Sequence, residues 1–123
     1  PAALAADAFS LPVADRCADW VVSTLVFHHF SPEQNAALLR EFSRVARRGF
    51  AILDLRRHYF PWIFVSIAGR IIFESRVSLF DGQASVLQAY TPEEARAIVR
   101  DAVPGSRVER IFPYRLLISG PGA

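Results

Sequence analysis

Two apolar runs separated by a single amphipathic segment dominate the middle of the chain. Residues 20–27 (WVVSTLVF) and 50–55 (FAILDL) are rich in β-branched and aromatic side chains, and we expect both to be strands. The first run is almost continuously apolar, which predicts a strand covered on both faces, as in a parallel sheet. Because parallel strands need a crossover connection, the segment between the runs is expected to be a helix.

Residues 31–48 carry the signals that begin and end a helix. Ser31 is a favourable N-cap, Pro32 suits the first helical position, and Gly49 is a natural residue to follow the helix C-terminus. Apolar residues recur between them at helical spacing: Ala37, Leu38, Phe42, Val45 and Ala46. The middle of the chain is therefore predicted to be a right-handed βαβ unit.

The flanking segments add further elements. Residue preferences predict a brief strand over residues 2–6. Thr91 and the proline after it repeat the helix-start pattern and open a helix that reaches about Ala102. Residues 108–112 and 115–119 are expected to be two strands, close enough in sequence to pair antiparallel.

Chain length indicates one domain, and composition argues against some classes of protein. The chain has 123 residues, of which 52% are hydrophobic, so a sizeable core is available. All 14 basic residues are arginine, but they are scattered among 12 acids and form no basic stripe with interleaved aromatics, which argues against nucleic-acid binding.

The same composition bears on location. Cys17 is the only cysteine, which excludes an intramolecular disulfide and fits a reducing cytoplasm. The N-terminus lacks the charged and apolar regions of a signal peptide. The most apolar segment, residues 60–73, is interrupted and too short to span a bilayer, so we expect no integral membrane segment and a cytoplasmic protein.

Five segments in order resemble the class I S-adenosylmethionine-dependent methyltransferases, in particular those with the type 11 domain pattern. They are DAFSLP at 7–12, DWVVSTLVFHHF at 19–30, RVARRG at 44–49, the strand containing Asp54, and TPEE at 91–94. The resemblance implies a Rossmann-like α/β sheet, mainly parallel, with one antiparallel strand near the edge. It also implies a single partial domain over 1–123, incomplete at its N-terminal side, with 56–89 as a lid-like insertion.

One departure from the family pattern concerns the cofactor. In the family, a glycine-rich loop after the first strand holds the methionine part of S-adenosylmethionine, and this chain has no glycine before Gly49. We therefore expect the chain to correspond to the C-terminal portion of the domain. By itself it is expected to bind the cofactor poorly.

The resemblance also assigns cofactor contacts to particular residues. Asp7 matches the carboxylate that accepts a hydrogen bond from the adenine amino group, with Ala8 and Phe9 beside it. Leu25, Val26 and His28 match residues that line the cofactor pocket. Two alternatives stay open from the residues alone, namely that Asp7 only caps a turn and that Phe9 only packs.

Two adjacent histidines, His28 and His29, have three interpretations. A metal site needs further ligands, and the sequence offers only His58 and a lone cysteine, so we predict no metal. Either histidine could act as a general base on a substrate hydroxyl. A structural role at the strand end is favoured over catalysis, because methyl transfer from a sulfonium can proceed by alignment and proximity.

Candidate substrate contacts follow the second strand. Arg56 or Arg57 could hold an anionic substrate, or both could be solvated loop residues. The aromatic segment after them, which includes Tyr59, Trp62 and Phe64, lies where the family carries a lid over the substrate. The same segment could instead lie on a membrane surface or form a dimer contact.

The function implied by the resemblance is methyl transfer from S-adenosylmethionine to an oxygen or carbon atom. The acceptor would be a small hydrophobic molecule, for example aromatic, polyketide or quinone-like. The alternative is a non-catalytic interaction module that persists as an edge-paired homodimer, because an incomplete sheet leaves a strand edge open.

Overall fold

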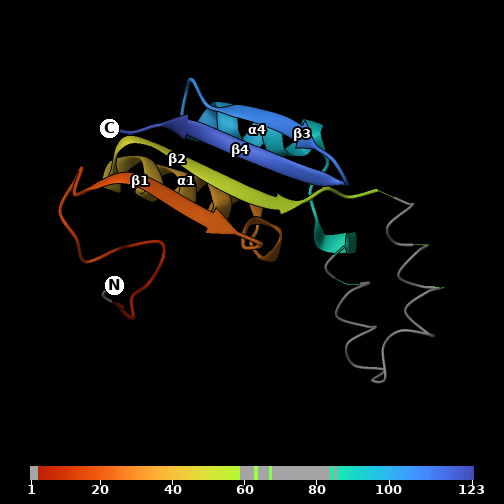
Figure 1. The fold of residues 1–123 in the computed structure, drawn as a ribbon, viewed down its shortest axis with the longest axis horizontal. Helices are drawn as coiled ribbons and strands as arrows, with labels where there is room; N and C mark the ends of the chain where they lie inside the picture. Colours follow the sequence, from red (N-terminus) through yellow and green to blue (C-terminus); the bar gives the residue numbers. More distant parts are fainter. Residues whose placement is uncertain (1–2, 59–62, 64–66, 68–83, 85) are drawn as a thin grey trace.

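The predicted βαβ unit is present in the computed structural model, which describes residues 3–58, 63, 67, 84 and 86–123. Strand β1 (Ala18–Thr24) leads through a one-turn 3-10 helix, η1 (Phe27–His29), into helix α1 (Pro32–Val45). Strand β2 (Ala46–Leu55) follows and pairs with β1 in parallel. The carboxyl ends of β1 and β2 therefore lie at the same edge of the sheet, as Figure 1 shows.

The end of β1 differs from the prediction. The strand stops at Thr24 rather than at residue 27, because Leu25 adopts a left-handed backbone with a φ of 57°. That conformation breaks the extended chain. Phe27 and the two histidines consequently lie in η1, where Phe27 and His28 are buried.

The end of α1 also differs. The helix ends at Val45 and the chain passes directly into β2, so Gly49 is a strand residue and not the residue that stops the helix. A Cβ atom on Gly49 would lie 2.6 Å from the carbonyl oxygen of Gly120 and 3.0 Å from the ring of Trp20. Close packing of neighbouring strands, and not helix termination, accounts for this glycine.

The predicted C-terminal elements are confirmed. Helix α4 (Pro92–Ala102) is followed by strands β3 (Arg107–Ile111) and β4 (Arg115–Pro121), which pair antiparallel. Within the described part of the chain the sheet has the order β1-β2-β4-β3. β4 runs antiparallel to both of its neighbours and lies next to the edge, as the sequence predicted.

Both helices begin with a capping box. The Ser31 hydroxyl accepts a hydrogen bond from the Gln34 amide, and the Gln34 side chain accepts one from the Ser31 amide. Thr91 and Glu94 make the same reciprocal pair at the start of α4. These local contacts satisfy amide groups that a helix N-terminus otherwise leaves without partners.

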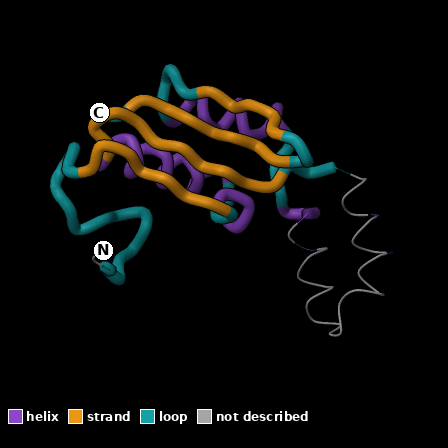
Figure 2. Tube along the Cα trace, viewed as in Figure 1, coloured by secondary structure: helices purple, strands orange, loops and turns teal. Residues whose placement is uncertain are grey.

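The predicted strand over residues 2–6 is wrong for its described part. Residues 3–6 are not paired with any strand and belong to a loop that continues to Cys17. A strand needs a neighbour for its backbone groups, and this loop runs outside the outer strand β1 instead of pairing with it (Figure 2). Most of the predicted insertion at 56–89 lies outside the described residues.

The helices cover one face of the sheet. Figure 1 shows α1 and α4 behind the strands, and the core lies between these layers. Its fully buried large side chains include Phe27, Leu38, Leu39, Phe50, Ile52, Leu116 and Ile118. On the other face of β1, Trp20 is 56% exposed and Val22 is 70% exposed, so the prediction that both faces are covered is wrong in the described structure. None of the described helices is long and apolar enough to span a membrane.

Candidate functional site

The carboxyl ends of β1 and β2 gather most of the predicted site residues. β1 delivers Leu25, Val26 and η1, and β2 delivers Asp54 near its end and Arg56 just beyond it. In open α/β sheets, ligands bind outside the carboxyl ends of the strands. This edge is therefore the candidate site.

A buried pair joins the two strand ends. His28 Nδ1 lies 2.6 Å from Asp54 Oδ1, and the His28 amide donates to Asp54 Oδ2 over 3.1 Å. The Leu55 amide donates to Asp54 Oδ1 over 2.6 Å. Both side chains are almost fully buried, His28 at 4% exposure and Asp54 at 2%. Asp54 therefore fixes the orientation of the His28 ring, and this orienting contact was not assigned from the sequence.

Two further polar residues hold η1 in place. The Asn35 side-chain amide, fully buried in α1, donates to the carbonyl oxygens of Phe27 and Phe30 over 2.9 and 3.2 Å. The Tyr90 hydroxyl also donates to the Phe30 carbonyl, over 2.5 Å. Burial raises the pKa of Tyr90, although a hydrogen bond with Asn35 opposes it. Asn35 was not assigned from the sequence; the signal that could have indicated it is a polar residue among the apolar positions of α1.

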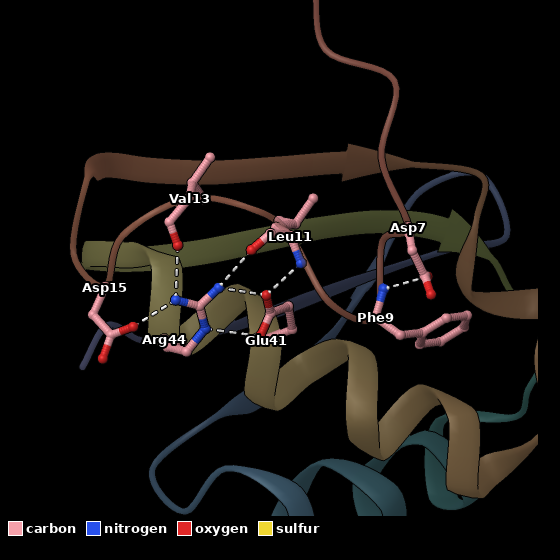
Figure 3. Close-up of polar contacts among 7 residues, drawn as sticks. All are labelled: Asp7, Phe9, Leu11, Val13, Asp15, Glu41 and Arg44. Carbon is pink, nitrogen blue, oxygen red and sulfur yellow. Dashed lines mark hydrogen bonds and ion pairs between the residues drawn. The ribbon is translucent and has the colours of Figure 1, made fainter.

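Asp7 lies in a turn close to the end of β1 (Figure 3). Its Oδ1 accepts a hydrogen bond from the Phe9 amide over 2.9 Å, and its carbonyl oxygen accepts one from the Ser10 amide over 3.1 Å. Asp7 thus caps a turn, which was the alternative interpretation of this residue. Asp7 Oδ2 has no partner among the described residues, so an acceptor oxygen is still available for a ligand.

Phe9 and Phe30 connect the Asp7 turn to η1. Their rings meet edge to face, with centroids 4.9 Å apart. Such aromatic pairs add a modest stabilising contact beyond the area they bury. The packing role expected as an alternative for Phe9 is therefore present, and it brings the Asp7 turn beside the residues that follow β1.

Arg44 fastens the rest of this loop to the end of α1, as Figure 3 shows. Its guanidinium donates to the carbonyl oxygens of Leu11 and Val13 over 3.1 and 3.0 Å, and it pairs with the carboxylates of Glu41 and Asp15. Glu41 also accepts from the Leu11 amide over 2.7 Å. The hydrogen bond from Arg44 lowers the pKa of Glu41, with burial opposing it.

Leu25 and Val26 form the sharp bend between β1 and η1. The Leu25 amide donates to the Leu53 carbonyl over 2.9 Å, which keeps the bend attached to β2. Leu25 is 44% exposed at this edge, whereas Val26 packs against the core. The bend therefore presents an apolar side chain and backbone to the candidate site.

The two arginines after β2 have different surroundings. Arg57 forms an ion pair with Glu94 at the start of α4. The guanidinium carbon of Arg56 lies 5.2 Å from the ring centroid of Tyr114, and its Nε atom is buried without a hydrogen-bond partner. Tyr59, Trp62 and Phe64, the predicted lid residues, lie outside the described residues.

His28, His29 and the residues around them form no metal site within the described residues. No group of three or more histidine, cysteine, aspartate and glutamate side chains is placed there to hold an ion. The rings of His28 and His29 lie 4.0 Å apart between centroids, and His29 is exposed.

A groove lies elsewhere on the molecule, between α4 and β3. It contains none of the predicted site residues and is lined by Arg96, Val99, Arg100, Gly105, Ser106, Arg107, Val108 and Glu109. β3 runs in the same direction as β1 and β2. The residues at the start of β3, which line this groove, therefore lie at the edge of the sheet opposite to the candidate site. The candidate site is therefore defined by its residues and by the sheet topology, and not by this groove.

Comparison with known proteins shows which proteins this chain resembles. Residues 1–53 match the model of a methyltransferase domain family. An S-adenosylmethionine-dependent methyltransferase from Aquifex aeolicus has a similar structure, with a TM-score of 0.60 and 21% identity over 94% of this chain and 52% of its own. The chain has the class I methyltransferase fold.

Other methyltransferases share this fold at lower identity. Human N-acetylserotonin methyltransferase, solved with S-adenosylmethionine, has a TM-score of 0.60 and 14% identity over 96% of this chain and 32% of its own. Magnesium protoporphyrin IX methyltransferase from Synechocystis, with bound S-adenosylhomocysteine, has a TM-score of 0.53 and 16% identity, covering 96% and 49%. A search of curated proteins found no sequence relative. This chain thus spans about half or less of each of these methyltransferases.

Proposed function

We propose that the protein transfers a methyl group from S-adenosylmethionine to an oxygen or carbon atom of a small hydrophobic acceptor. The observation that carries the proposal is the convergence of the Asp7 turn, the Leu25 bend and the His28–Asp54 pair at one sheet edge. Because the chain spans only part of the methyltransferases it resembles, the activity is proposed for the whole protein.

The described residues fit the adenine end of the cofactor. An unpartnered Asp7 oxygen suits the adenine amino group, and Ala8 and Phe9 lie beside it in the same turn. Leu25, Val26 and His28 would line the adjoining part of the pocket. Bound S-adenosylmethionine supplies an electrophilic methyl group on a sulfonium. The glycine-rich loop that holds its methionine end in this fold is not found among residues 1–48.

The two histidines differ in the part they can take in proton transfer. Asp54 holds Nδ1 of His28, so Nε2 is the ring nitrogen that would take part in proton transfer. His29 is exposed beside it and can meet an acceptor directly. General base catalysis by either residue remains an option of the mechanism, since alignment of acceptor and methyl group can suffice.

The acceptor would bind beyond the end of β2. Arg56 and Arg57 begin this region, and Tyr59, Trp62 and Phe64 are proposed to cover the acceptor as an apolar lid. Such a lid excludes water and suits an aromatic, polyketide or quinone-like molecule. We also propose a cytoplasmic location for the protein.

Amide chemical shifts test the cofactor site. We expect S-adenosylhomocysteine at millimolar concentration to shift the backbone amides of Asp7–Phe9 and Leu25–His28. Asp7→Asn should weaken the binding roughly tenfold, as expected for a lost charge-assisted hydrogen bond. Asp15→Asn is the matched control and should leave it unchanged. Shifts confined to other residues, or none at all, would contradict the proposed site.

A second candidate function is self-association through β1. Its outer edge has no strand partner among the described residues, and exposed Trp20 and Val22 lie on the open face. Unpaired edges favour strand addition. Sedimentation should then give a dimer that Val22→Lys dissociates, whereas Leu4→Lys, at a 64% exposed site outside the sheet, should not. A monomer at all concentrations would rule this function out.

A further inference from the structure

We propose that Arg56 binds a carboxylate carried by the methyl acceptor, whereas Arg57 serves only the fold. The inference rests on the proposed function, because it narrows the chemical class of the acceptor. It separates two neighbouring arginines that the sequence left equivalent.

The backbone of Arg56 is held from two sides at the sheet edge. Its amide donates to the Tyr114 carbonyl over 2.9 Å, which continues the pairing of β2 with β4. Arg56 also forms a parallel bridge with Tyr90, and the Arg57 amide donates to the Tyr90 carbonyl over 3.1 Å. Hydrogen bonds therefore fix the backbone at Arg56, and this residue does not belong to a solvated loop.

The guanidinium of Arg56 is also oriented. Its central carbon lies 5.2 Å from the ring centroid of Tyr114, within the range of a cation–π contact. A guanidinium that contacts an aromatic face can still donate its N–H groups to other partners. The contact with Tyr114 uses a face of the guanidinium and none of its N–H groups.

The charge of Arg56 is not neutralised within the described structure. No carboxylate pairs with it there, and its Nε atom is buried without a hydrogen-bond partner. A buried donor without a partner costs free energy. Such groups are rare in folded proteins, and a functional role or a bound molecule commonly explains them. The two terminal nitrogens of a guanidinium can bind a carboxylate with two parallel hydrogen bonds, and no carboxylate among the described residues occupies those of Arg56.

Arg57 presents the opposite case. It is paired with Glu94, the same residue that closes the capping box of α4. Partial burial works to raise the pKa of Glu94, but hydrogen bonds from the Thr91 amide and from Arg57 outweigh it and lower the pKa. Arg57 is thus already committed to the start of α4, and a ligand would have to displace Glu94.

Binding of benzoate, with benzamide as its neutral counterpart, tests the assignment on the full chain. We expect benzoate to shift the Arg56 Nε–H resonance and to bind at least tenfold more tightly than benzamide. Arg56→Gln should weaken benzoate binding tenfold or more, Arg56→Lys should give an intermediate loss, and Arg57→Gln should change it less than twofold. Backbone amide spectra of each variant establish that it is folded.

The proposal is overturned if Arg57→Gln weakens benzoate binding as much as Arg56→Gln, if benzamide binds equally well, or if benzoate does not bind. Binding of S-adenosylhomocysteine is measured separately on the same samples. Benzoate binding without cofactor binding would leave the carboxylate site standing and remove support for methyl transfer. Cofactor binding without benzoate binding would support the proposed cofactor site and overturn the carboxylate site at Arg56.

Discussion

Removing the Asp54 carboxylate should destabilise the fold more than removing any exposed acid. Asp54 accepts hydrogen bonds from the His28 amide, the His28 ring and the Leu55 amide, and its side chain is 2% exposed. An unsatisfied buried donor costs about 1–3 kcal/mol, and Asp54→Ala leaves three donors without their acceptor. We expect Asp54→Ala to lower the free energy of unfolding by about 3–5 kcal/mol.

Asp54→Asn sharpens this expectation. The amide keeps the shape of the side chain and one acceptor oxygen, but it replaces the other oxygen with a donor that faces N–H groups. The loss should then be smaller, about 1.5–3 kcal/mol, as expected for hydrogen bonds to a charged group. Asp15→Ala is the matched control, because the Asp15 side chain is 72% exposed in its pair with Arg44 and should contribute at most about 1 kcal/mol.

Urea denaturation followed by circular dichroism and Trp fluorescence measures these differences as changes in midpoint at constant slope. A domain has only about 5–15 kcal/mol of stability, so Asp54→Ala could unfold the chain outright. Asp54→Asn, His28→Ala and the double variant then supply the coupling energy of the pair. A loss for Asp54→Ala no larger than that for Asp15→Ala would refute the view that Asp54 holds η1 and β2 together.

Two further predictions concern other contacts. Because Arg44 holds the pKa of Glu41 in the folded protein below its ordinary value of 4.5, Glu41 should stabilise the fold above that pH and lose this contribution as the pH falls below it. The unfolding free energies of the wild type and Glu41→Gln should therefore differ at pH 7, and the difference should shrink as the pH falls below 4.5; a constant difference would contradict this. Gly49→Ala should cost about 1–3 kcal/mol by overpacking against Gly120 and Trp20. Gly49→Ala combined with Trp20→Ala should not recover the wild-type stability, because the contact with the Gly120 backbone remains; full recovery would assign the strain to the ring alone.

Local sequence signals determined most of the fold. The N-cap residues Ser31 and Thr91, each followed by proline, marked both helix starts correctly because capping depends on contacts within four residues. The order of β-rich and helical segments was sufficient for the parallel βαβ unit and the closing antiparallel pair. The same signals misplaced the ends of β1 and α1, where the left-handed Leu25 and the packing of Gly49 depend on neighbouring strands.

The candidate site depended on tertiary structure to a greater extent. The sequence singled out His28 but not its orientation, because Asp54 lies 26 positions away and becomes its partner only through the register of β1 with β2. Arg56 and Arg57 were equivalent as sequence, and only the positions of Tyr114 and Glu94 distinguish them. The sequence by itself thus determined the elements and their order, since those follow from interactions between near neighbours. The tertiary structure decided which polar groups are paired, since burial and strand register bring distant residues into contact.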